Sequence, residues 1–268
     1  MINRVIERTR KIYDAIANEW DISRPILRPE RQKLARKVKI GQSVLDIGCG
    51  NGILYEFLAP KSIDYTGLDF SQKLLAIARR RSRSATSNLS SRAKAAIAAE
   101  VEGSRRSRYK FVLGEATKLP FKDNTFDWVF ALAVYHHLPS AELRRKALEE
   151  VQRVLKPGGK LALTVWNLLS EYAREKYKIR LGENDVFIPW RATAGATFER
   201  YAHIFKRKEL RDLLIVAGFK DINVSYIMHV IYGAPGEITE ADVKQGRDLS
   251  AVAIKPLTPA LPLKGGGG

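Results

Sequence analysis

Apolar runs and amphipathic segments alternate along the middle of this chain, and that alternation restricts its fold more than any other feature. The runs that indicate buried strands cover residues 43–47, 63–69, 109–113, 126–134 and 159–166. The apolar spacing that indicates helices covers residues 52–58, 71–81, 140–155 and 207–217. Strands that alternate with helices build a parallel sheet covered by helices on both faces. We therefore expect an α/β fold.

The end of the pattern differs from its beginning. Two long strand-like runs cover residues 221–231 and 248–255, and no convincing helix joins them. Parallel neighbours need a long crossover connection, so this arrangement predicts an antiparallel pair. The expected sheet is seven-stranded and mostly parallel, with an antiparallel last strand, which is a Rossmann-like arrangement.

Several segments lie outside this pattern. Apolar residues at helical spacing, and then a basic helix that ends near Val38, predict an N-terminal helical cap over 1–40 before a main domain over 41–256. Residues 82–108 fit either a basic arm that binds nucleic acid or a surface insertion with a short helix at 92–101, and the low cost of surface insertions favours the second. The other expected segments are a substrate-side insertion over 168–205 and a disordered tail over 257–268.

Composition restricts the partners and the location. The net charge of +17 is typical of proteins with an anionic partner such as nucleic acid. Nine Arg/Lys and two Glu between Arg79 and Arg108 supply +7 of it, so the net charge of the rest of the chain is smaller.

Cys49 is the only cysteine, which excludes a multi-cysteine metal site, and we expect no metal. No apolar run is long enough for a membrane span and the first residues are charged, so we expect a cytoplasmic protein without membrane attachment.

A glycine-rich turn follows the first strand, in the sequence Val44-Leu45-Asp46-Ile47-Gly48-Cys49-Gly50-Asn51-Gly52. Such a turn brings a cofactor close to the backbone, where a side chain would occupy its space. Ile53 stands where the dinucleotide fingerprint has its third glycine, and the charge of Asp46 would repel a pyrophosphate. S-adenosylmethionine has no phosphate and carries two positive groups, so it suits an acidic loop. The residues expected to bind it here are Asp46, Gly48, Cys49, Gly50 and Gly52.

The ends of the following strands suit the remainder of that cofactor. Asp69 ends the second strand, where it can accept hydrogen bonds from both ribose hydroxyls; as an alternative, it caps the helix that follows. After the third strand, Glu115 can accept from the adenine amino group while the N–H of Ala116 meets a ring nitrogen. The remaining expected cofactor contacts are Phe70 and Ala131.

These blocks, with Phe126-Asp127-Trp128-Val129 and Lys156-Pro157-Gly158-Gly159-Lys160 after them, resemble class I S-adenosylmethionine-dependent methyltransferases of the Methyltransf_11 type. The resemblance covers roughly residues 40–167, apart from the insertion. It implies a Rossmann-like methyltransferase fold and assigns 41–256 as the methyltransferase domain. This chain has Glu115 where the family usually has Asp, which is a mild chemical exchange.

Four further blocks resemble one subfamily, the tRNA wobble-uridine methyltransferases that esterify 5-carboxymethyluridine. They are Ile16-Ala17 through Ser23-Arg24, Tyr135-His136-His137-Leu138, Ile188-Pro189-Trp190, and Arg200 through Phe205. Ser23, Ala202 and the segment 26–29 depart from the subfamily pattern. The resemblance implies the anticodon loop of tRNA as the partner, and a small activator subunit, which contains zinc in eukaryotic relatives.

Esterification of a carboxylate determines which residues the acceptor site needs. A carboxylate is anionic at pH 7 and needs no general base, so the enzyme has to orient it for in-line attack on the methyl carbon. Arginine grips a carboxylate through two parallel hydrogen bonds, and aromatic rings stack splayed bases. The expected catalytic residues are Arg24, His136 and Arg200, and the expected substrate-binding residues are Tyr135, His137, Trp190, Arg191, Tyr201 and His203. For the aromatic and histidine residues, ordinary packing or a structural hydrogen bond is the alternative.

Two other functions stay open. The same cofactor blocks would serve a small-molecule methyltransferase that acts on a quinone, a lipid or a cofactor precursor, which predicts an apolar, enclosed acceptor pocket. A catalytically silent binding module would be favoured by the loss of Asp46, Asp69 or a loop glycine, and all of these are present.

Overall fold

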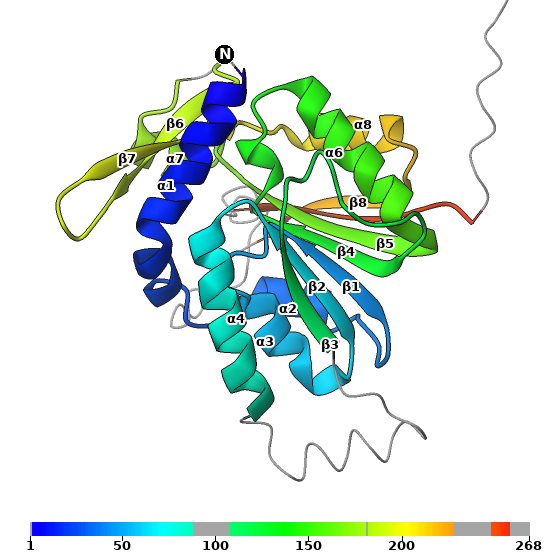
Figure 1. Cartoon of the computed structure of the whole chain (residues 1–268). Coiled ribbons are helices and arrows are strands. Elements are labelled where there is room, and N and C mark those ends of the chain that lie inside the picture. The colour runs from blue at the N-terminus through cyan, green and yellow to red at the C-terminus, as the bar shows by residue number, and fades with distance from the viewer. Residues whose placement is uncertain (1, 88–107, 181, 228–247, 258–268) are drawn as a thin grey trace, which may run out of the picture.

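A seven-stranded sheet forms the centre of the computed structural model, which describes residues 2–87, 108–180, 182–227 and 248–257 (Figure 1). In sheet order the strands are β3 (Arg108–Leu113), β2 (Asp64–Asp69), β1 (Ser43–Ile47), β4 (Phe126–Leu132), β5 (Leu155–Trp166), β9 (Asp248–Ile254) and β8 (Lys220–Ile227). The first five strands run parallel, and β9 is antiparallel to both of its neighbours. The expected Rossmann-like sheet with an antiparallel last strand is confirmed.

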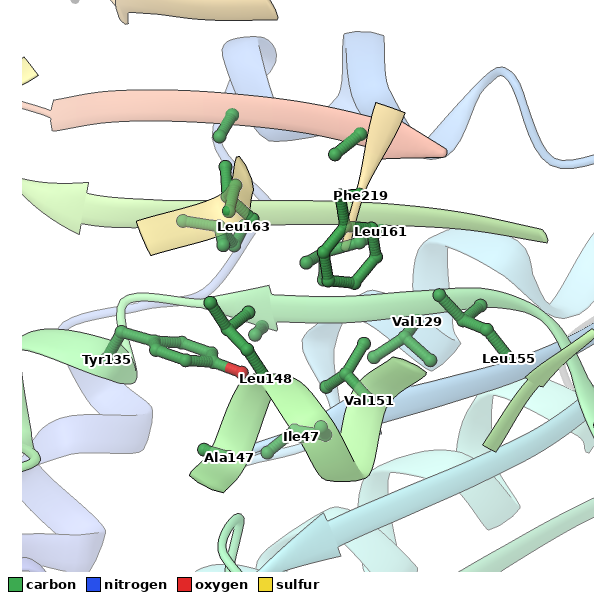
Figure 2. Close-up of a cluster of buried hydrophobic side chains, with 14 of the residues drawn as sticks. Ile47, Val129, Tyr135, Ala147, Leu148, Val151, Leu155, Leu161, Leu163 and Phe219 are labelled. Atoms are coloured by element: carbon green, nitrogen blue, oxygen red, sulfur yellow. The ribbon is translucent and has the colours of Figure 1, made fainter. Parts of the chain in front are cut away.

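Helices cover both faces because successive residues of a strand point to opposite sides of the sheet. In β5, Leu161 and Leu163 pack toward α6 (Ala141–Val154) and α8 (Arg207–Val216), and Figure 2 shows Leu148 and Val151 of α6 in that layer. Ala162, which lies between them in sequence, packs toward the opposite face. The helices on that face are α2 (Pro29–Ala35), α3 (Ile53–Leu58) and α4 (Gln72–Ser87), with the 3-10 turn η1 (Ala59–Lys61) after α3.

A smaller layer at one end of the sheet combines two distant parts of the chain (Figure 1). α1 (Ile2–Ile22) packs Ile12, Tyr13 and Ile16 against α4. After α7 (Glu171–Tyr177), strands β6 (Asp185–Arg191) and β7 (Thr197–His203) form a separate two-stranded sheet. β7 contacts both α1 and the 3-10 turn η2 (Tyr135–His137) that follows β4. This layer therefore stands beside the carboxyl ends of the parallel strands.

The elements differ from the sequence expectation in several places, among them the start of β5, which lies at Leu155 instead of residue 159. α4 continues to Ser87, so the segment expected as an insertion from residue 82 begins as helix, and Ser82 is fully buried. The strand expected over 126–134 ends at Leu132, because Ala133 has a φ of 64° and η2 follows. The segment 168–205 holds α7 and the β6–β7 hairpin, neither of which the sequence analysis predicted.

Other expectations fall outside the described residues. These are the short helix at 92–101, the end of the strand-like run beyond residue 227 and the tail from residue 258. Within the described ranges, no helix is both long and apolar enough to cross a membrane.

The assigned core can be tested by cavity formation. Leu163→Ala should lower the free energy of unfolding by about 2–5 kcal/mol, because the truncated side chain is fully buried between β5 and the helices. Leu113→Ala at the edge of the sheet, where the leucine is 48% exposed, should cost less than about 1 kcal/mol. Chemical denaturation measures both values, and equal losses would contradict this core.

Candidate active site

The carboxyl ends of β1, β2 and β3 open into one cavity of about 340 Å³, which will be called the cofactor cavity. Its volume lies within the range of small-molecule and cofactor sites. The α1 helix and the segment after β4 complete the wall through Tyr13, Trp20 and His137. The residues predicted to bind the cofactor that line this cavity are Gly48, Gly50, Asp69, Phe70, Glu115 and Ala116.

The glycine loop reaches the cavity because it lacks side chains. Gly48 and Gly50 have φ values of 66° and 55°, which other residues rarely adopt. A Cβ on Gly48 would lie 2.4 Å from Cγ2 of Val134, in the segment after β4. Gly52 has a different task, because a Cβ there would lie 3.0 Å from Cβ of Ala78 in α4. Gly52 therefore permits helix packing instead of lining the cavity.

Three other predicted cofactor residues point into the protein interior. The hydroxyl of Tyr65 donates to the Asp46 carboxylate over 2.6 Å, and both groups are buried. Cys49 packs in the core of the sheet, and Ala131 is fully buried in β4. Their side chains do not line the cofactor cavity as the structure describes it. The prediction is corrected for these three side chains. Alternation along β1 and β4 turns Asp46 and Ala131 into packed layers, and Cys49, in the loop after β1, packs against the core.

Asp69 is a buried acceptor at the end of β2. One of its carboxylate oxygens accepts from the N–H of Gly50 over 2.9 Å, and the other accepts from the N–H of Ser71 over 2.8 Å. The second bond closes a local turn, and the first ties β2 to the glycine loop. The alternative role of Asp69 as the helix cap is wrong, because α4 begins at Gln72 and the Oγ of Ser71 accepts from the N–H of Leu74. Burial raises the pKa of Asp69 to about 6. Each oxygen keeps further lone pairs for a ligand hydroxyl.

A second cavity of about 670 Å³, here called the acceptor cavity, adjoins the first. Arg24, Arg28, Trp166 and Asp248 line both cavities. Further residues of the acceptor cavity include Tyr172, Lys176, Trp190, Arg191 and Arg200. Five of these are cationic and Asp248 is acidic, so the acceptor cavity has a strongly basic wall. The sequence predicted four of them, namely Arg24, Trp190, Arg191 and Arg200.

Arg200 is an unusual member of that wall. It is only 5% exposed, yet its Nε and Nη1 atoms have no hydrogen-bond partner among the described residues. Its guanidinium lies 5.0 Å from the ring centroid of Trp166 and 5.2 Å from that of Trp190. Desolvating a cation without partners is costly, and an anion in the cavity would restore the missing bonds. The geometry thus suits a carboxylate or a phosphate.

Arg24 lies at the boundary between the two cavities. Its guanidinium carbon is 3.3 Å from the ring centroid of Trp20 and 5.5 Å from that of Trp190, and Nη1 donates to Oγ of Ser23 over 2.7 Å. Burial lowers the pKa of Arg24 to about 10, so it stays cationic at neutral pH. It can therefore add a second positive charge beside a bound anion.

Two of the residues predicted in the segment after β4 are buried. Tyr135 packs in the core beside Leu148 (Figure 2), so the prediction that it stacks on a base is wrong. His136 is fully buried and stacks on Trp166 with ring centroids 4.2 Å apart, outside the described walls of both cavities. Burial also holds the pKa of His136 well below its ordinary value. The predicted catalytic role of His136 is corrected to support of the Trp166 ring.

Two predicted substrate residues of β7 belong to a structural network. His203 bonds to Asp185 over 2.9 Å and to Glu209 of α8 over 2.7 Å, while the hydroxyl of Tyr201 donates to Asp185. Both side chains lie outside the described walls of the two cavities. We correct their predicted role to anchoring of the hairpin on α8. His137, in contrast, lines the cofactor cavity as a ligand-side residue.

The sequence analysis missed several cavity residues, namely Tyr13, Arg28, Lys176 and Asp248. The close succession of Arg24, Arg28 and Arg31 was a signal that could have found Arg28. Asp248 lies more than 200 residues from Arg31 in sequence, and the pair meets at 3.3 Å only through the fold. Lys176 lies on a helix that no periodicity indicated.

Comparisons with known proteins agree with this geometry. The family model described as a methyltransferase domain matches residues 45–163. A protein of Encephalitozoon cuniculi that carries the name of a methyltransferase is 34% identical over 178 residues, which cover 66% of this chain and 70% of that protein. The chain belongs to the methyltransferase family.

Two further relatives carry more specific names. The tRNA (carboxymethyluridine(34)-5-O)-methyltransferase of Schizosaccharomyces pombe is 27% identical over 231 residues, covering 79% of this chain and 88% of that protein. The demethylmenaquinone methyltransferase of Paenarthrobacter aurescens is 31% identical over 177 residues, covering 60% of this chain and 59% of that protein.

Solved structures share the fold. An S-adenosylmethionine-dependent methyltransferase of Methanosarcina mazei superimposes with a TM-score of 0.58 and 25% identity, covering 87% of this chain and 100% of that chain. A chain from the complex between the Haloferax volcanii Trm112 methyltransferase activator and a methyltransferase gives a TM-score of 0.62 and 22% identity, covering 94% of this chain and 100% of that chain. The enzyme is thus an S-adenosylmethionine-dependent methyltransferase.

The residues around the cofactor cavity fit this cofactor. We propose that Asp69 accepts from the ribose hydroxyls, that Glu115 and Ala116 meet the adenine, and that Gly48 and Gly50 leave space at the loop. Arg31 lines the same cavity with a buried Nε that has no hydrogen-bond partner in the described part of the chain, so it would hold the carboxylate of the cofactor. The bound cofactor supplies an electrophilic methyl group.

Replacement of Asp69 tests the ribose contact. Asp69→Asn should weaken binding of both S-adenosylmethionine and S-adenosylhomocysteine by about tenfold or more, because the variant loses charge-assisted hydrogen bonds to the hydroxyls. Titration calorimetry measures the affinities. Asp212→Asn on the exposed side of α8 is the matched control and should leave both unchanged. Unchanged binding in Asp69→Asn would refute the contact.

The pKa of Asp69 gives the pH dependence of binding. Burial raises this pKa to about 6, so the group is a carboxylate above that pH and takes up a proton below it. The carboxylate accepts at both oxygens, so cofactor affinity should be full at pH 7 and should fall as the pH drops through 6. Affinities measured between pH 5 and 7 should show this slope in the parent enzyme and lose it in Asp69→Asn. A slope that persists in the variant would contradict the assignment.

Proposed function

We propose that this enzyme esterifies the carboxylate of 5-carboxymethyluridine at the wobble position of tRNA. The observation that carries the proposal is Arg200, a buried guanidinium with two unpartnered atoms, Nε and Nη1, in a basic cavity that adjoins the cofactor cavity. Trp166 and Trp190, with ring centroids 5.0 and 5.2 Å from the Arg200 guanidinium, line the same cavity and would supply aromatic contacts to a splayed base. The named activity of the Schizosaccharomyces pombe relative supports the same acceptor.

The chemistry of a carboxylate acceptor agrees with the side chains at hand. Its oxygen is already a nucleophile at pH 7, so no proton has to be removed and no general base is required. The enzyme has to hold the acid in one orientation, and Arg200 can do so through two parallel hydrogen bonds. Arg24 supplies the second charge from the boundary of the two cavities. The buried and neutral His136 is compatible with a reaction that needs no base.

The partners follow from the proposed acceptor. The anticodon loop of tRNA would bind across the basic wall of the acceptor cavity, and the net charge of +17 would favour that encounter. The neighbour from Haloferax volcanii comes from a complex with an activator, which supports a small activator subunit for this chain as well. With a tRNA acceptor, the proposed site of action is the cytoplasm.

A small-molecule acceptor is the second candidate. The demethylmenaquinone methyltransferase relative, 31% identical to this chain, supports it. A quinone needs an apolar pocket, whereas Arg24, Arg191 and Arg200 line the acceptor cavity. The basic wall therefore favours the tRNA acceptor.

Methyl transfer to tRNA tests the proposal. Labelled S-adenosylmethionine is incubated with the enzyme and bulk tRNA, with and without a coexpressed activator subunit, and the nucleosides are identified by mass spectrometry. The expected product is the methyl ester of 5-carboxymethyluridine. Absence of that ester in both arms, together with methylation of a demethylmenaquinone, would replace the proposal by the second candidate.

The role of Arg200 has its own test. Arg200→Lys should lower kcat/KM for tRNA by about tenfold or more, because lysine keeps the charge but loses the planar fork that orients a carboxylate. Affinity for S-adenosylhomocysteine should not change, since Arg200 lies outside the described wall of the cofactor cavity. The matched control is Arg145→Lys on the exposed side of α6, which should behave as the parent enzyme. Equal kcat/KM in the two variants would remove Arg200 from the mechanism.

A further inference from the structure

Tyr13 of α1 is a buried residue of the cofactor cavity, and neither cofactor binding nor acceptor binding as proposed uses it. It lines the cavity, and its ring centroid lies 5.1 Å from that of Trp20 and 6.0 Å from that of Phe70. Phe70 follows the ribose contact Asp69, and Trp20 stacks with Arg24 at the boundary of the two cavities. Tyr13 therefore stands between the cofactor side and the acceptor side.

The hydroxyl of Tyr13 bonds to Nε2 of His137 at 2.8 Å, and the Arg200 guanidinium also acts on the Tyr13 oxygen as a hydrogen-bond donor. The other ring nitrogen of His137, Nδ1, lies 2.7 Å from the backbone carbonyl oxygen of Tyr201. A carbonyl oxygen only accepts, so Nδ1 must carry the proton. Burial lowers the pKa of His137 to about 3, so the ring is neutral and Nε2 has a free lone pair. Nε2 can then only accept.

This chain of bonds fixes the proton of Tyr13. The hydroxyl donates to Nε2 of His137, and it has no second proton to donate. Burial raises the pKa of Tyr13, which keeps the phenol protonated. Toward the cavity the Tyr13 oxygen can therefore only accept. Two positive side chains, Arg24 and Arg200, already act on this oxygen from the acceptor side, so it lies within electrostatic reach of the anion site.

We propose that the Tyr13 oxygen accepts C–H hydrogen bonds from the methyl group of S-adenosylmethionine and aims that group at the acceptor cavity. A methyl group on a positively charged sulfur has polarised C–H bonds, so an oxygen with its proton turned away is a suitable partner. His137 is a positioning residue, because it acts by holding the proton of Tyr13. The inference rests on the cofactor and on the cavity boundary, and it holds for any acceptor bound near Arg200.

The first test removes the oxygen and compares two ligands. Tyr13→Phe keeps the ring packing and should weaken S-adenosylmethionine binding by about threefold to fivefold. Binding of S-adenosylhomocysteine, which lacks the methyl group, should be unchanged in titration calorimetry. The proton signal of a ¹³C-labelled methyl group on the bound cofactor should move upfield in the variant, because the oxygen no longer deshields it. Equal changes for both ligands, or an unchanged methyl signal, would overturn the proposal.

The second test addresses the direction of the proton. His137→Leu should reproduce the changed ratio of the two affinities, because Tyr13 loses the acceptor that holds its proton. His137→Gln should restore the ratio, since an amide can donate to the Tyr201 carbonyl and accept from Tyr13. Tyr109→Phe in β3, far from the cavity, is the control for removal of a hydroxyl and should keep the parent ratio. Failure of glutamine to restore more than leucine does would refute the positioning role.

Discussion

A Cβ on Gly48 would lie 2.4 Å from a methyl group of Val134, so the loop after β1 and the segment after β4 meet at a distance that only glycine allows. Asp69 fixes the other side of this loop by accepting from the N–H of Gly50. The cofactor cavity forms beside this contact between the glycine loop and the Val134 side chain, and the acceptor cavity begins at the boundary marked by Arg24 and Trp166. A wider loop would separate the donor site from the acceptor site.

The main feature of the acceptor cavity is a buried cation whose hydrogen-bonding capacity is not fully used. Arg200 is buried near Trp166 and Trp190, and two of its nitrogen atoms have no hydrogen-bond partner in the described part of the chain, which is costly unless an anion binds. The hairpin that carries it is anchored through His203 to Asp185 and Glu209, so the guanidinium is held in place before a substrate arrives. Such preorganisation would suit the proposed carboxylate acceptor, which needs no deprotonation.

Local patterns in the sequence were enough to predict the sheet, the glycine loop and the residues at the ends of β2 and β3. These features depend on short-range order, and the carboxyl ends of parallel strands meet at one edge in any such fold. The sequence could not show which way a side chain points at the limits of a strand, so Asp46, Ala131 and Tyr135 were placed in the site although they are buried. Contacts between distant segments were also hidden, as with Tyr13 and His137, which are 124 positions apart.

The central claim is that Arg200 selects an anionic acceptor beside the cofactor. Equilibrium binding of 5-carboxymethyluridine, its methyl ester and uridine to the enzyme loaded with S-adenosylhomocysteine measures this most directly. The account predicts that the carboxylate form binds about tenfold or more tightly than the two neutral nucleosides, and that Arg200→Lys loses most of this preference. Equal affinity for the three nucleosides, or a preference that survives in Arg200→Lys, would contradict it.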